Sequence, residues 1–180
     1  LRPGRIDRKI KVSRPDMDSA KQILGIYLTD DLRIEAEAIT EHGSEAAARD
    51  VFIEQTTVAL FARTEETKFL EVSLRSGRTE SLHFGDLASG ALIDNIVQRA
   101  KEAAIKRAIA DGQVEVAGLC LEDLLGAVRS EYRENEVFPP SDSVADWLTL
   151  LDYDPENVVR VAPVTASDER EPPVSTGTVI

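Results

Sequence analysis

A long helical pattern between Ser89 and Gly112 constrains the fold of this chain more than any other feature. Apolar side chains recur there at the spacing of an α-helix, at Ile93, Ile96, Val97, Ala100, Ala104 and Ala108. Serine is a favoured N-cap residue, and the glycine supplies a stop. A helix of this length with one apolar face must bury that face, so the chain contains a packed helical part.

A β-hairpin is predicted before this helix. Leu70, Val72 and Leu74 alternate with polar residues, and a second alternating run of Glu80, Leu82 and Phe84 follows the turn at 75–78. Gly77 can take the positive φ that a tight turn demands.

The remaining elements are predicted from the spacing of apolar residues. We expect helices after 15–16, over 44–62 and over 121–135, an extended piece at 32–35, a short helix around 145–148 and a last strand near 158–164 that completes the sheet. The fold class is therefore α+β.

The charge of the chain excludes some classes of partner. The net charge of −12 argues against nonspecific binding to nucleic acid or to an anionic membrane. Residues 1–15 differ, with a net charge of about +5 against about −17 for the rest, and the bland interpretation of such a terminus is a solvated tail. The chain begins with Leu1 and shows no leader, so we expect a fragment of a longer protein without a secretory signal.

No apolar run approaches the roughly 20 residues that cross a bilayer. A single cysteine, Cys120, cannot form an internal disulfide, and we interpret it as a buried structural thiol. His42 and His83 lie far apart in the sequence without a cysteine partner, so no metal site is expected. These features favour a soluble, reducing, cytoplasmic location.

The basic opening carries the first of two nucleotide-related patterns. It reads Leu-Arg-Pro-Gly-Arg-Ile-Asp, with two arginines around a Pro-Gly turn and a short alternating strand after it. This resembles the end of the second region of homology in AAA ATPases. The resemblance implies that Arg2 and Arg5 face the nucleotide of the neighbouring subunit, where a permanently charged guanidinium stabilises the transferring phosphoryl group. The alternative is that both arginines are surface charge.

The second pattern is Ser89-Gly90-Ala91 at the start of the long helix. In AAA lid domains a step of this kind places small residues and backbone amides beside the adenine and ribose. The resemblance therefore implies nucleotide contacts at Gly90 and Ala91. Small residues after a serine N-cap also occur at helix starts that bind nothing, which is the competing interpretation.

The predicted hairpin narrows the family. Lys-Phe-Leu-Glu-Val at 68–72 and Leu-His-Phe-Gly-Asp at 82–86 resemble the inserted module of the ring-forming, proteasome-associated AAA ATPases of actinobacteria. The resemblance implies this division of the chain: the end of the AAA large domain at 1–15, a helical lid from 16–30 and 86–138, a β-grasp-like insert at 31–85 completed by the strand near 158–164, and a flexible tail at 165–180.

In that family the parent protein is a homo-hexamer that uses ATP and Mg²⁺ to unfold proteins and feed them to a bacterial proteasome, including substrates tagged with a ubiquitin-like protein. This chain has neither the phosphate-binding loop nor the paired magnesium-binding acids, so alone it should neither hydrolyse ATP nor bind it firmly. The family's tail docks the core proteasome through a terminal apolar residue preceded by tyrosine. Here Val179 and Ile180 stand in those places, without the tyrosine.

Two other functions stay open. The first is an AAA remodeller, a chaperone-like unfoldase that acts without a proteasome, which the missing tyrosine favours. The second is a non-enzymatic interaction module in which Arg2 and Arg5 are surface charge.

Overall fold

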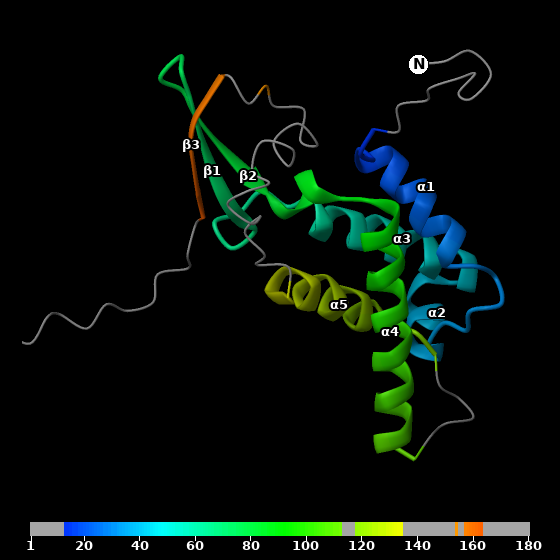
Figure 1. Ribbon diagram of the computed structural model, residues 1–180. Helices are drawn as coiled ribbons and strands as arrows, with labels where there is room; N and C mark the ends of the chain where they lie inside the picture. Colours follow the sequence, from blue (N-terminus) through cyan, green and yellow to red (C-terminus); the bar gives the residue numbers. More distant parts are fainter. Residues whose placement is uncertain (1–12, 113–117, 135–153, 155–156, 164–180) are drawn as a thin grey trace, which may run out of the picture.

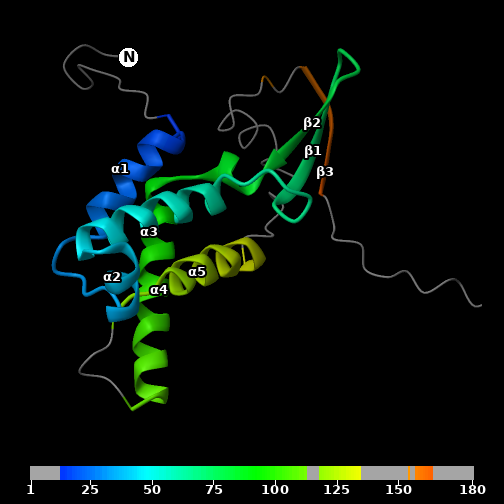
Figure 2. The ribbon, with the colours of Figure 1, turned by 180° about the vertical axis from the view of Figure 1, so that it is seen from behind.

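The computed structural model describes residues 13–112, 118–134, 154 and 157–163 of the chain. In chain order the elements are α1 (Met17–Tyr27), α2 (Ala36–His42), α3 (Glu45–Leu60), β1 (Lys68–Leu74), β2 (Thr79–His83), the 3₁₀ turn η1 (Phe84–Leu87), α4 (Gly90–Ala110), α5 (Leu121–Glu134) and β3 (Val158–Pro163). The helices gather around α4, and the sheet stands beside them, as the two opposite views of Figures 1 and 2 show. The predicted α+β class is confirmed.

The helix boundaries follow from local chemistry. The side chains of Asp16, Ser44 and Ser89 accept hydrogen bonds from the backbone N–H groups three residues on, at 2.8, 3.1 and 3.2 Å, which satisfies donors that have no partner inside the helix. Gly43 and Gly112 follow α2 and α4 with φ of 82° and 67°, the left-handed conformation in which helices commonly end. The helices expected after 15–16, over 44–62, from Ser89 and over 121–135 are confirmed within a few residues.

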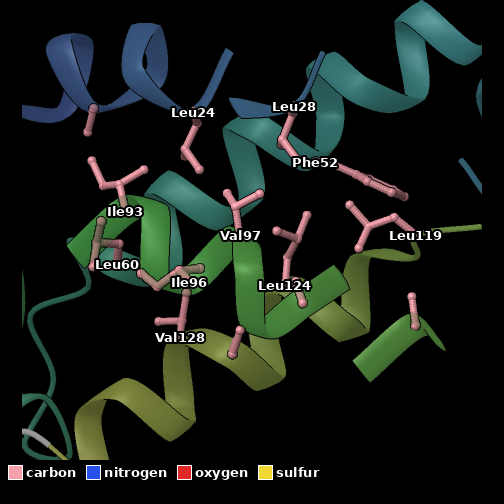
Figure 3. Close-up of a cluster of buried hydrophobic side chains, with 14 of the residues drawn as sticks. Leu24, Leu28, Phe52, Leu60, Ile93, Ile96, Val97, Leu119, Leu124 and Val128 are labelled. Carbon is pink, nitrogen blue, oxygen red and sulfur yellow. The ribbon is translucent and has the colours of Figure 1, made fainter. Parts of the chain in front are cut away.

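The main core lies between α1, α3, α4 and α5. Buried side chains from these helices meet in one cluster, which Figure 3 shows around Leu24, Phe52, Leu60, Ile96 and Val128. Each large aliphatic or aromatic side chain placed there stabilises the fold by about 1.5–3 kcal/mol relative to its exposed state. The cluster holds the start of α4 against α1 and α3.

The buried face of α3 lies in the main helical core. Its buried residues Ala48, Phe52 and Leu60 belong to the same cluster as Leu24 of α1 and Ile93 of α4. The expected division at 31–85 groups this helix with the hairpin, whereas its apolar face here is buried against α1, α4 and α5. The functional division of the chain stays a prediction.

The sheet has three antiparallel strands in the order β2-β1-β3. Leu70 pairs with Leu82 on β2, and Val72 pairs with Val161 on β3. The turn between β1 and β2 contains Gly77 at φ 83°, as predicted. Leu70, Val72 and Leu82 form a small core of their own, separate from the helical one. The predicted hairpin and the predicted closing strand near 158–164 are both confirmed.

Two features of the fold did not follow from the sequence pattern. Helix α2 occupies residues directly after the segment expected to be extended, and Ile34 forms a parallel bridge with Leu119. The short helix expected around 145–148 and the tail at 165–180 lie outside the described residues.

Candidate functional site

The start of α4 is the one predicted contact site that lies within the described residues. Ser89 is the extended N-cap, with φ −146° and ψ 162°, and its Oγ accepts a hydrogen bond from the N–H of Leu92 at 3.2 Å. The N–H groups of Gly90 and Ala91 have no acceptor inside the helix. A Cβ added to Gly90 would meet no atom within 4 Å, and Ala91 is exposed. The helix start therefore presents open backbone rather than side chains.

A tight corner fixes this helix start to the end of α3. The corner is η1, in which Asp86 Oδ2 accepts a hydrogen bond from the N–H of His83 at 2.8 Å, and Asp86 Oδ1 lies 2.6 Å from Arg63 Nη2. Gly85 passes so close to α3 that an added Cβ would lie 2.9 Å from both Leu60 O and Phe61 Cα. Only glycine allows this approach without a backbone shift.

Tyr132 of α5 contacts both the η1 corner and the end of α3. Its ring meets that of Phe84 edge to face, with centroids 4.2 Å apart, and its hydroxyl donates hydrogen bonds to Ala59 O at 2.7 Å and Leu60 O at 3.2 Å. These carbonyls belong to the last turn of α3, where intrahelical partners run out. Burial raises the pKa of Tyr132 to about 12 because the phenolate is poorly solvated there.

Arg14 connects the segment before α1 to the loop before α4. Its Nη1 donates a hydrogen bond of 2.7 Å to the carbonyl of Leu87, two residues before the Ser89 cap. Arg14 also lines an open cleft of about 850 Å³ with Met17 of α1, Phe61 and Arg63 beyond α3, and residues of β2 and η1. Gly90 and Ala91 do not line this cleft, so the predicted contacts lie beside it rather than inside it.

A second charged cluster lies at the other end of α4, about 25 Å away at 1.5 Å per residue. Arg107 donates hydrogen bonds to Glu35 Oε1 at 2.6 Å, to Asp123 Oδ2 at 2.8 Å and to Gly118 O at 2.9 Å. Asp123 Oδ2 also accepts from the N–H and the thiol of Cys120, at 3.0 and 3.2 Å. These bonds tie α2, α4 and α5 together, which indicates a structural role.

Cys120 is half-buried in this cluster. Its pKa is raised, first because burial disfavours the thiolate. A protonated, hydrogen-bonded thiol is a poor nucleophile. This agrees with the structural role predicted for the cysteine.

The other predicted site residues have different outcomes. Arg2, Arg5, Val179 and Ile180 lie outside the described residues, so their roles stay predictions. His42 ends α2 and His83 ends β2. Across the described ranges no group of three or more His, Cys, Asp or Glu side chains is placed to hold a metal ion. In the same part of the chain no helix has both the length and the apolar character to cross a membrane.

The open start of α4 is compatible with the predicted nucleotide contact. Adenine and ribose offer a flat face and hydrogen-bond acceptors, and Gly90 leaves room for a flat group to approach two backbone N–H donors. The contact of Gly90 and Ala91 with the base end of a nucleotide stays a prediction. In the sequence alone, Arg14 stands out only as one of the basic residues of 1–15, and Gly85 does not stand out as a site residue. The Arg-Pro-Asp step that ends at the N-cap Asp16 is the local signal that places Arg14 at a junction.

Comparison with known proteins matches this chain to a family of AAA+ ATPase lid domains and to ATPases. A family model described as the ARC AAA+ ATPase lid domain matches residues 15–179. Proteins named proteasome-associated ATPase from Acidimicrobium ferrooxidans and Sanguibacter keddieii are 42% identical over 161 residues and 44% identical over 162 residues. A protein from Kocuria rhizophila named AAA ATPase forming ring-shaped complexes is 40% identical over 150 residues. The alignments cover 88%, 89% and 83% of this chain but only 27%, 27% and 26% of those proteins. The chain thus spans about a quarter of the length of these curated relatives.

Proposed function

The chain belongs to the ARC AAA+ ATPase lid-domain family, and from this membership we propose that it is the lid of a ring-forming, ATP-dependent protein unfoldase. The family predicted from the sequence is confirmed by the match over 15–179 and by relatives named proteasome-associated ATPase. The parent protein is a homo-hexamer located in the cytoplasm, and it unfolds proteins and passes them to a core proteasome. Its substrates include proteins tagged with a ubiquitin-like protein.

Within that protein the lid contacts nucleotide at its base end. Gly90 and Ala91 touch the adenine and ribose of the subunit's own ATP, and Arg2 and Arg5 reach the phosphates held by the next subunit. The phosphate loop and the Mg²⁺ ligands belong to the large domain that precedes the lid, and the lid alone does not bind ATP firmly. The sheet of β1, β2 and β3 belongs to a β-grasp-like insert that positions the tail ending in Val179 and Ile180.

The open start of α4 is the observation that best supports this proposal, and it gives a direct test. Gly90→Leu in the full-length ATPase adds a side chain where nothing lies within 4 Å, so the fold is kept while the approach of a nucleotide is blocked. We expect the Kd for ATP to rise about tenfold or more, which corresponds to about 1.4 kcal/mol. Gln98→Leu is the matched control, because Gln98 is exposed on the same helix. An unchanged Kd in Gly90→Leu would exclude the contact.

Delivery to a proteasome is tested separately. Degradation of a tagged test protein by core proteasome is compared between the full-length ATPase and a form lacking 175–180. Loss of degradation with ATP hydrolysis retained supports docking through Val179 and Ile180. Degradation that continues without these residues removes the tail from the proposal.

A proteasome-independent unfoldase is the second candidate. The name of the Kocuria rhizophila relative mentions rings and no proteasome. In that case the full-length protein unfolds the test protein with ATP, and core proteasome adds no degradation. A non-enzymatic module is the remaining alternative, and it requires a full-length protein that neither binds nor hydrolyses ATP.

A further inference from the structure

Arg14 links two parts of the chain that are far apart in sequence. Its hydrogen bond of 2.7 Å to Leu87 O spans 73 positions and ends two residues before the N-cap of α4. The guanidinium is permanently charged, and a charge-assisted bond to a carbonyl is stronger than a neutral one. Arg14 therefore holds the incoming segment against the loop that starts α4.

Both ends of this link are anchored. On one side Pro15 has a fixed φ, and Asp16 caps α1 by accepting a hydrogen bond from the N–H of Ser19 at 2.8 Å. On the other side the N–H of Ala88 donates to Gly85 O at 3.0 Å, and Ala88 is fully buried. The residues on both sides of the hydrogen bond between Arg14 and Leu87 O are therefore held in place.

The exposure of Arg14 suits a contact that changes. The residue is solvent-exposed, whereas the corner behind it is built from the buried residues Phe84 and Gly85 and from Tyr132. An exposed hydrogen bond can break and form again without opening the helical core. The link is thus the adjustable part of a junction whose other contacts are rigid.

We propose that Arg14 is a positioning residue for the nucleotide contact at Gly90. Through its hydrogen bond to Leu87 O, it fixes the position of Gly90 relative to the chain segment that precedes the lid. The inference rests on the proposed function and adds a residue to that site. Arg14 does not touch the nucleotide. It acts through Leu87 and the three-residue step to Gly90.

The test uses the full-length ATPase with Arg14→Ala and Arg14→Lys. The Kd for ATP is measured by titration with a fluorescent ATP analogue, and the hydrolysis rate is measured at saturating ATP. We expect Arg14→Ala to raise the Kd about three- to tenfold, because the charge-assisted hydrogen bond to Leu87 O is lost, with the saturated rate within about twofold of the unchanged enzyme. Arg14→Lys keeps the charge and a donor, so it should recover part of the affinity. Arg78→Ala removes an equal charge on the hairpin, next to Glu80, and should leave the Kd unchanged.

The outcomes separate this inference from the function on which it rests. A normal Kd in Arg14→Ala overturns the inference, and so does a loss of saturated rate at normal Kd. If Gly90→Leu raises the Kd while Arg14→Ala does not, only the role of Arg14 fails. If neither variant changes the Kd, the proposed nucleotide contact itself is wrong. Equal melting temperatures confirm that the variants are folded.

Discussion

Replacing Tyr132 with phenylalanine removes one hydroxyl and little else. The edge-to-face contact with Phe84 survives, while the hydrogen bonds to Ala59 O and Leu60 O are lost. A hydrogen bond of this kind contributes about 0.5–1.5 kcal/mol net, and the carbonyls at the end of α3 are left without this donor. We therefore expect Tyr132→Phe to lower the free energy of unfolding by about 1–1.5 kcal/mol at pH 7.

The same hydroxyl makes the difference depend on pH. In the unfolded chain the phenol titrates near its ordinary pKa of about 10, whereas burial raises the pKa in the folded chain to about 12. Because the folded pKa is the higher one, the contribution is complete below about pH 10 and is lost as the pH rises toward 12. At pH 11, one unit above the unfolded pKa and one unit below the folded pKa, deprotonation favours the unfolded chain by about 1.4 kcal/mol, which equals the advantage at pH 7. The two stabilities should therefore become equal near pH 11.

Urea denaturation of the unchanged chain and of Tyr132→Phe, at several pH values between 7 and 11, measures how the difference in their free energies of unfolding depends on pH. Subtracting the two curves cancels the titration of lysines and other groups that both chains share. A difference that stays constant up to pH 11 would show that the hydroxyl is not buried as described. A difference below about 0.5 kcal/mol at pH 7 would refute the stabilising bonds to the end of α3.

Two further substitutions, each with a control, test the close approach at Gly85 and the charged cluster at the far end of α4. Gly85→Ala places a Cβ 2.9 Å from the backbone of Leu60 and Phe61 and should cost about 1–3 kcal/mol in urea denaturation, whereas Gly25→Ala in α1, with its nearest atom at 3.9 Å, should stabilise by about 0.5–1 kcal/mol. Equal effects of the two changes would argue against the close approach. Asp123→Asn weakens the acceptor shared by Arg107 and Cys120, so we expect it to lower the melting temperature and to reduce the free energy of unfolding by about 1–3 kcal/mol. Asp94→Asn, which alters only an exposed hydrogen bond from Gln98 on α4, is the control and should change the melting temperature little. An unchanged melting temperature in Asp123→Asn would refute a structural role for this cluster.

The sequence predicted those elements whose signals are local. The hairpin follows from two alternating runs around Gly77, and α4 follows from its apolar spacing after Ser89. The strand near 158–164 was expected to complete the sheet, and it pairs with β1 as expected. For the hairpin and α4 a few neighbouring residues are enough to determine the local backbone, whereas the pairing of β3 with β1 joins residues as far apart as Val72 and Val161.

Other features that depend on tertiary contact were not predicted. The apolar spacing of α3 shows which face is buried but not which partner covers it. Gly85 occupies a position that needs glycine only because the backbone of α3 lies against it. The short α2 has few apolar residues and no buried one, so its periodicity is weak. Of the site, Gly90 and Ala91 could be named from the sequence, whereas the link from Arg14 to Leu87 required the fold.

The strand order β2-β1-β3 has a consequence for synthesis on the ribosome. Val72 and its partner Val161 are 89 positions apart, the difference of their numbers. At about 5–20 residues per second, on the order of ten seconds pass between the emergence of the two strands. By then α1 to α5 have all been made, since α5 ends at Glu134. During that interval one edge of β1 lacks its partner strand and is open to pairing with other nascent chains.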